Sequence, residues 1–271
     1  MKIAVAGAGY VGLVTAACFS ELGNDVICVD IDEEKIRKLN SDIMPIYEPG
    51  VEELAKRNRK EKRLVFTTDL KDAIKKSEII FICVGTPPKE NGDADLSYVE
   101  NVARTIADVM DSYKLIVDKS TVPVQTGEKV ARTIKSYNRH KVEFDVISNP
   151  EFLREGSAVN DFMHPDRIVI GCESEKAKEI MEKLYAPLKS PILYTDIKSA
   201  EIIKHASNSF LATKISFINA VANICELAGA DVEKVAEGMG MDKRIGSQFL
   251  NAGIGYGGFC FPKDAEAFIR I

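Results

Sequence analysis

The segment GYGGFCFPKD, residues 255–264, places a cysteine among residues that suit a nucleophile. Glycines precede Cys260, and Lys263 and Asp264 follow it. Glycines let the backbone of a tight loop approach a ligand closely, and a nearby cation favours the thiolate form of a cysteine. We therefore expect Cys260 to attack a substrate carbon. A small packing residue is the alternative interpretation.

Lys204 and Asn208, four residues apart, form a second candidate group. They lie on a segment from about Ser199 to Ala228 that lacks proline and glycine and repeats apolar residues with the helical period. The apolar residues cover more than one side, which predicts a helix buried between domains or subunits. Burying a lysine on an apolar face is costly unless its charge is paired or serves catalysis. An amine that reaches solvent along its methylene stem is the alternative.

Three predicted strands end in polar side chains that could face a ligand. They are Thr86 in VGTPP, Thr121 in KSTVP and Glu151 in SNPEF. Open α/β sheets bind ligands beyond the carboxyl ends of their strands. We expect these three residues to converge there, although each alone could be a turn or cap residue.

The N-terminal segment predicts the element that would hold a dinucleotide. KIAVAGAGYVGLVTAACFSELGNDVICVD reads as strand, turn, helix and strand, with Gly7, Gly9 and Gly12 in the turn. These glycines permit the tight turn, the approach of a pyrophosphate and close packing of helix on strand. The helix N-terminus offers free N–H groups to the phosphates. Asp30, which ends the second strand, would bind ribose hydroxyls and repel a 2′-phosphate, so NAD is favoured over NADP.

Strands and helices continue to alternate beyond this unit, which predicts an α/β, doubly wound Rossmann-type domain over residues 1–198. A long central helix and a small helical domain follow over residues 199–271. The further strands are expected in LVFTT, EIIFICVG, KLIVDKST, FDVISNP, RIVIGC and PILYT.

Composition narrows the class of protein. The 271 residues are 45% hydrophobic and 28% charged, and the net charge is −5. These values fit a globular protein and argue against nucleic-acid or anionic membrane partners. The basic run KRNRKEKR, residues 56–63, is interpreted as a solvated helix face. We see no apolar run long enough to span a bilayer and no signal peptide. The six cysteines are scattered without a Cys-x-x-Cys pair, so we expect no metal site and a cytoplasmic location.

These motifs together resemble the nucleotide-sugar 6-dehydrogenases of the UDP-glucose/GDP-mannose dehydrogenase family. The resemblance covers the whole chain and rests on GAGYVGL, VGTPP with NGDADLSYV, KSTVP, NPEFLREGSAV, PDRIVIG, EIIKHASNSFLATKISFIN and GYGGFCFPKD. It implies NAD-dependent, four-electron oxidation of UDP-glucose to UDP-glucuronate through a cysteine thiohemiacetal and thioester. NPEFLREG and PDRIVIG look like the UDP-glucose branch, with GDP-mannose as the alternative substrate.

The resemblance also assigns catalytic roles. Cys260 would be the nucleophile, and Lys204 with Asn208 would stabilise the oxyanion. Asp264 and Thr121 would position a water for proton transfer, and Glu151 would assist hydrolysis of the thioester.

Binding roles follow from the same resemblance, together with a homodimer formed through the long helix. Cofactor-binding residues would be Gly7, Gly9, Tyr10, Val11, Gly12, Asp30, Lys35, Thr86, Thr121 and Glu155. Substrate-binding residues would be Glu151, Phe152, Leu153, Glu155, Lys204, Asn208, Arg244, Phe249, Asn251 and Gly257. Arg244 would reach the substrate of the neighbouring subunit.

Two features depart from the family pattern. The loop that begins at KSTVP, here called the threonine loop, usually has a glycine where this chain has Gln125. The substitution predicts a stiffer loop. Family members also continue into a C-terminal domain that holds much of the UDP, so we expect this chain to bind NAD but to turn over UDP-glucose poorly. A β-hydroxyacid-type dehydrogenase without a thiol step and a non-catalytic NAD-binding module are the competing interpretations.

Overall fold

The structure, a computed structural model, describes residues 1–87, 89, 94–258 and 260–269, without the side chains of Cys260 and Lys263. The chain divides into two compact units, Met1–Lys204 and His205–Ile271.

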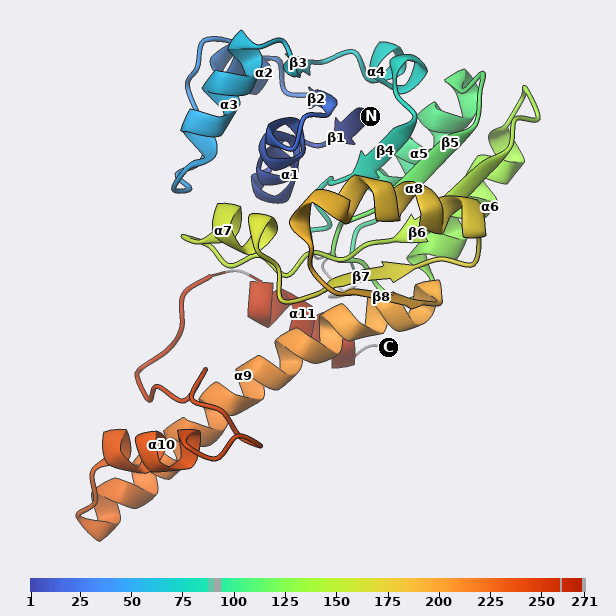
Figure 1. Cartoon of the computed structure of the whole chain (residues 1–271). Helices are drawn as coiled ribbons and strands as arrows, with labels where there is room; N and C mark the ends of the chain where they lie inside the picture. The colour runs from blue at the N-terminus through green and yellow to red at the C-terminus, as the bar shows by residue number, and fades with distance from the viewer. Residues whose placement is uncertain (88, 90–93, 259, 270–271) are drawn as a thin grey trace. The chain divides into compact units, whose positions relative to one another are not determined.

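The first unit is built on one sheet, whose strand order over the described residues is β3-β2-β1-β4-β5-β6-β7-β8 (Figure 1). Neighbouring strands are parallel except β6 and β7, which pair antiparallel. The order reverses between β1 and β4, and such a reversal opens a crevice at the carboxyl edge of the sheet. The strands are β1 (Lys2–Ala6), β2 (Asp25–Val29), β3 (Leu64–Thr67), β4 (Ile79–Ile82), β5 (Lys114–Asp118), β6 (Phe144–Ser148), β7 (Ile168–Gly171) and β8 (Ile192–Thr195).

Helices cover both faces of this sheet. Side chains alternate along β1, so Ile3 and Val5 join one buried cluster and Ala4 and Ala6 join the other. The doubly wound α/β fold expected from the sequence is confirmed. The helices are α1 (Tyr10–Glu21), α2 (Glu33–Asn40), α3 (Val51–Lys60), α4 (Leu70–Lys76), α5 (Ser97–Val109), α6 (Thr126–Tyr137), α7 (Ala158–Met163), α8 (Glu175–Tyr185) and the 3-10 turn η1 (Ala186–Leu188).

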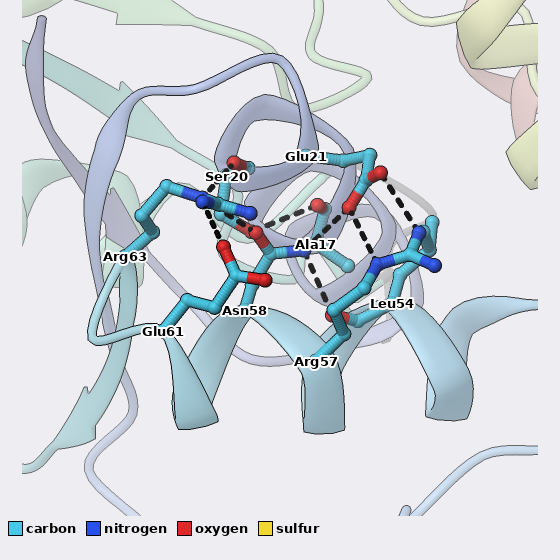
Figure 2. A network of polar contacts seen from close by, with 8 residues as sticks. All are labelled: Ala17, Ser20, Glu21, Leu54, Arg57, Asn58, Glu61 and Arg63. Atoms are coloured by element: carbon cyan, nitrogen blue, oxygen red, sulfur yellow. Dashed lines mark hydrogen bonds and ion pairs between the residues drawn. The ribbon is translucent and has the colours of Figure 1, made fainter.

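The basic run on α3 is not simply a solvated face, which corrects our interpretation. The Glu21 carboxylate of α1 pairs with Arg57 at 2.8 Å and accepts a 2.8 Å hydrogen bond from the buried Asn58 (Figure 2). The Nε of Arg63 donates to the Asn58 side chain and to the Ser20 carbonyl. Part of the basic charge is therefore used to fix α3 against α1.

The second unit contains most of the long helix α9 (Ile197–Ala228), followed by α10 (Val232–Gly240) and α11 (Cys260–Ile269). The predicted long helix is confirmed, and Gly229 follows it with φ 72°, the left-handed conformation common after helix ends. By length and composition α9 could cross a membrane, with a mean hydropathy of 1.3 in its most apolar window. Our expectation that no run is long enough is therefore wrong, although core helices of soluble proteins meet the same criterion.

Candidate active site

The glycine-rich turn after β1 has the geometry of a phosphate cradle. A Cβ on Gly7, which has φ 107°, would lie 2.5 Å from the Cys83 carbonyl oxygen, and one on Gly12 would lie 1.8 Å from the Gly7 oxygen. Only glycine fits either position. In contrast, a Cβ on Gly9 would meet nothing within 4 Å among the described residues, and none of their side chains caps the N-terminus of α1. This open helix end, at Tyr10 and Val11, fits a dinucleotide pyrophosphate.

Asp30 lies at the end of β2, as predicted, with its carboxylate already ordered. It accepts hydrogen bonds from the Ala8 N–H at 2.8 Å and the Asp32 N–H at 3.0 Å, and Lys35 Nζ lies 2.9 Å from Oδ2. Burial alone would raise the pKa of Asp30, but the Lys35 and backbone hydrogen bonds hold that pKa below its usual value. An ionised Asp30 can accept hydrogen bonds from ribose, and Lys35 lies beside it.

Glu48, which our sequence analysis did not single out, connects the cofactor turn to the loop after β6. Its carboxylate accepts hydrogen bonds from the Tyr10 hydroxyl at 2.5 Å and from the N–H groups of Gly156 and Ala158 at 2.8 Å. Burial, followed by the contact with Glu48, raises the pKa of Tyr10, so its hydroxyl stays protonated and donates. Glu155 in the same loop is exposed. The PIYEPG segment that contains Glu48 reads as a turn and carries no signal of this role.

The structure brings Thr86 and Thr121 together after β4 and β5. Thr86 Oγ1 donates to the Thr121 carbonyl at 2.9 Å. The helix that follows this loop, α6, is held by Glu201, which accepts hydrogen bonds from the N–H groups of Gln125 at 2.7 Å and Gly127 at 2.9 Å. Gln125 has φ 76°, a region that favours glycine, so its backbone keeps a glycine-like conformation.

The most informative contact is an ion pair between Lys204 and Glu151. Lys204 Nζ lies 2.9 Å from Glu151 Oε1, and the two side chains are only 5% and 7% exposed. The second carboxylate oxygen accepts a 2.6 Å hydrogen bond from the Leu153 N–H. Lys204 therefore has a partner, and the alternative in which its amine reaches solvent is wrong.

Phe152, which lies between Glu151 and Leu153 in the loop, packs against the side chain of Arg167. The Arg167 guanidinium lies 3.7 Å from the centroid of the Phe152 ring, and Lys204 Nζ lies 5.6 Å from the same centroid. The aromatic face thus borders the buried ion pair.

In the second unit, Asn208 Nδ2 donates to Asp264 Oδ2 at 2.6 Å. Cys260 is the first residue of α11, and Asp264 follows one turn later. The predicted role of the Cys260 thiol falls on a side chain outside the described part of the structure.

The remaining expected substrate residues of the second unit lie between α10 and α11. Arg244 is exposed and pairs with Asp242, at 2.6 Å for the shortest contact. Phe249 has φ 63°, and its ring centroid lies 6.1 Å from that of Phe261. Asn251 and Gly257 are exposed. Substrate contacts of these residues stay predictions.

Comparison with known proteins places this geometry in a family. Residues 1–189 match the NAD binding domain, and residues 198–271 the central domain, of the UDP-glucose/GDP-mannose dehydrogenase family. The chain belongs to this family. It therefore carries the family's NAD-binding domain, and NAD is its cofactor.

Several family members are similar over nearly the whole chain. The UDP-glucose 6-dehydrogenase TuaD of Bacillus subtilis is 56% identical over 270 residues, which cover 100% of this chain and 59% of that protein. The structure of a UDP-glucose dehydrogenase from Pyrobaculum islandicum has a TM-score of 0.95 at 44% identity, covering 99% of this chain and 63% of that one. The GDP-mannose dehydrogenase structure from Pseudomonas aeruginosa has a TM-score of 0.87 at 38% identity, covering 100% and 64%. The chain thus spans about 60% of the length of these relatives.

Proposed function

We propose that this chain supplies the NAD-binding domain, residues 1–198, and the catalytic part, residues 199–271, of an NAD-dependent UDP-glucose 6-dehydrogenase. The observation that carries the proposal is the buried Lys204–Glu151 pair, at 2.9 Å, in a family member whose relatives include UDP-glucose dehydrogenases. A buried ion pair is weak support for stability. The Lys204–Glu151 pair is better explained by a catalytic role.

In the first oxidation, the primary alcohol at C6 loses a hydride and a proton and becomes an aldehyde. Lys204 would stabilise the developing oxyanion, with Asn208 one helical turn further along α9. Thr121 and Asp264 would position the water that takes the proton. NAD, when bound on the glycine turn and Asp30, supplies the hydride acceptor.

In the second oxidation, the Cys260 sulfur would add to the aldehyde carbon and give a thiohemiacetal. Loss of a second hydride and a proton from this adduct leaves a thioester, and water then cleaves the C–S bond to give the carboxylate and free thiol. Glu151 would position or activate that water. Lys263, three residues after Cys260 in the sequence, would favour the thiolate form of the nucleophile.

The test is the stoichiometry of NADH per uronate, measured with UDP-glucose and with GDP-mannose on the chain extended to the full length of the relatives that it matches. The proposal predicts two NADH per uronate from UDP-glucose and loss of uronate after alkylation of Cys260. One NADH per product with no effect of alkylation would favour the β-hydroxyacid-type alternative. Faster NADH formation from GDP-mannose than from UDP-glucose would identify GDP-mannose as the substrate. NAD binding without NADH formation from either sugar would favour a non-catalytic module.

We extend the proposal to a homodimer formed through α9. Phe210, Phe217 and Ile224 recur every seven residues and are 64%, 51% and 63% exposed. This spacing keeps them on one helix face, as in helices that pair. Light scattering should report a dimer that Phe217→Glu converts to a monomer, and a monomeric wild-type chain would refute this extension.

A cytoplasmic location belongs to the same proposal. Among the described residues, Cys18, Cys28, Cys83, Cys172 and Cys225 are free thiols. Thiols of this kind persist in a reducing compartment.

A further inference from the structure

Lys119 is a buried lysine close in sequence to Thr121, a predicted catalytic residue. The proposed mechanism does not use it. It directly follows β5, two residues before Thr121, and is 4% exposed. Its Nζ lies 3.2 Å from the side-chain oxygen of Asn149 and 3.5 Å from the Asn149 carbonyl. Asn149 also accepts a 2.5 Å hydrogen bond from Tyr185 and donates one of 2.8 Å to the Val169 carbonyl. Lys119 is thus fixed at the base of the loop that begins two residues before Glu151.

Charged and titratable groups from several elements face this lysine. The Glu151 carboxylate favours the charged form of Lys119 and Lys204 opposes it, and the Phe162 ring centroid of α7 lies 6.0 Å from Lys119 Nζ. Burial is the main cause that lowers the pKa of Lys119, to about 8. Burial also raises the pKa of Cys83 to about 12, so that thiol is neutral near pH 7.

The balance of charge follows from these neighbours. Lys204 and Glu151 form a pair with no net charge, and a protonated Lys119 adds one positive charge to it. In a buried site such a charge acts at low effective dielectric and attracts an anion strongly.

We propose that Lys119 is a positioning residue of the active site, which fixes Asn149 at the base of the Glu151 loop and makes the Lys204–Glu151 pair net positive. The positive cluster favours the oxyanion that Lys204 stabilises. This inference rests on the proposed function for its catalytic consequence, but its structural basis can be measured without turnover.

Two variants separate charge from packing. Lys119→Arg keeps a positive charge at every pH, whereas Lys119→Met removes it. Lys114→Met is the matched control, because Lys114 is also buried, lies at the start of the strand that Lys119 follows, and donates its amine to the Ser77 carbonyl. The Lys114 and Lys204 resonances are assigned with Lys114→Met and Lys204→Arg.

The first readout is NMR of the lysine side-chain 13Cε and 15Nζ nuclei between pH 6 and 11. We expect one resonance to titrate near pH 8 and to be missing from both Lys119 variants but present in Lys114→Met. The Lys204 resonance should shift through the same pH in the wild-type chain and in Lys114→Met, and in neither Lys119 variant. Titration of Lys119 in the ordinary lysine range, or a Lys204 resonance that ignores it, would overturn the inference. If Lys119→Met does not fold, the wild-type and Lys119→Arg titrations still decide.

The second readout is the pH profile of NADH formation from UDP-glucose by the chain extended to the full length of its relatives. The rate of the wild-type chain should fall as the pH rises through 8, because Lys119 loses its charge. Lys119→Arg should not show this fall in rate, which forms the alkaline limb of the profile. Lys119→Met should be slower than the wild type by about tenfold below pH 8. A purely structural role would leave the position of the limb unchanged in Lys119→Arg, and that result would refute the proposal. Failure of all variants and of the wild type to form NADH would count against the proposed function alone, because the NMR titration is independent of turnover.

Discussion

The Lys204 ammonium of α9 and the Glu151 carboxylate of the loop after β6 meet at 2.9 Å although the residues are 53 positions apart. Removing both charges from water is costly, and loss of one partner leaves the other buried without compensation. The pair therefore links folding stability to the proposed chemistry through the same two atoms.

Lys204→Met should lower turnover by about 10²–10³, comparable to the loss of one oxyanion donor. It should also lower the free energy of unfolding by about 3–5 kcal/mol, because Glu151 stays buried without its partner. Adding Glu151→Gln should recover much of that stability and none of the turnover. Urea unfolding and NADH formation are the measurements, and normal turnover of the single variant would refute the role of Lys204.

Glu151→Gln alone should slow hydrolysis of the thioester more than its formation. Mass spectrometry of the protein after reaction with NAD and UDP-glucose should then show a covalent sugar adduct at Cys260. The control is the double variant with Cys260→Ser, which should carry no adduct. A slow enzyme without adduct would place Glu151 in an earlier step.

Asp118 should make stability depend on pH in the direction opposite to most carboxylates. Burial, followed by the nearby Glu201 carboxylate, raises the pKa of Asp118 from 3.8 to about 8, against the opposing N–H of Ser120. The folded chain therefore binds the proton more tightly than the unfolded chain, and this contribution to stability is lost as pH rises from about 4 to about 8.

Asp118→Asn should be more stable than the wild type at pH 8 by about 2–5 kcal/mol, and the difference should vanish near pH 4. Asp108→Asn, which changes a half-exposed carboxylate on α5, is the control and should have little effect at either pH. Thermal unfolding at several pH values measures this difference. A constant difference between pH 4 and 8 would show that Asp118 does not titrate as expected.

Gln125→Gly should stabilise the threonine loop. Its φ of 76° costs an L-residue about 1–2 kcal/mol, and glycine avoids that cost. The greater conformational freedom of glycine in the unfolded chain offsets part of this gain. We expect a net gain of about 0.5–1 kcal/mol in the free energy of unfolding. Gln125→Ala keeps the backbone strain and should show no such gain. Equal stability of the two variants would mean that the strain is relieved elsewhere.

Asp30 should make the chain bind NAD more tightly than NADP by one to two orders of magnitude, about 1.5–3 kcal/mol. Lys35 lies beside the carboxylate and would attract a 2′-phosphate, so Lys35→Met should widen the preference and Asp30→Asn should narrow it. Calorimetric titration with each cofactor measures both effects. Equal affinities in the wild type would remove Asp30 from the ribose site.

Local patterns in the sequence determined the elements of this protein. The glycine turn, the buried strands and the long helix were all predicted, because backbone sterics and the periodicity of apolar residues act over short stretches of chain. The candidate nucleophile and the Lys204–Asn208 spacing were visible for the same reason.

The tertiary structure decided which polar groups meet. The antiparallel pairing of β6 with β7 depends on the path of the connection, and the pattern of apolar residues does not encode it. Glu48 and Glu201 accept hydrogen bonds from N–H groups on distant segments, and Lys119 donates to the side chain of Asn149, which follows another strand. A charged residue reads as a surface residue in sequence. Only the folded chain shows which charges have left water, because burial depends on everything that packs around them.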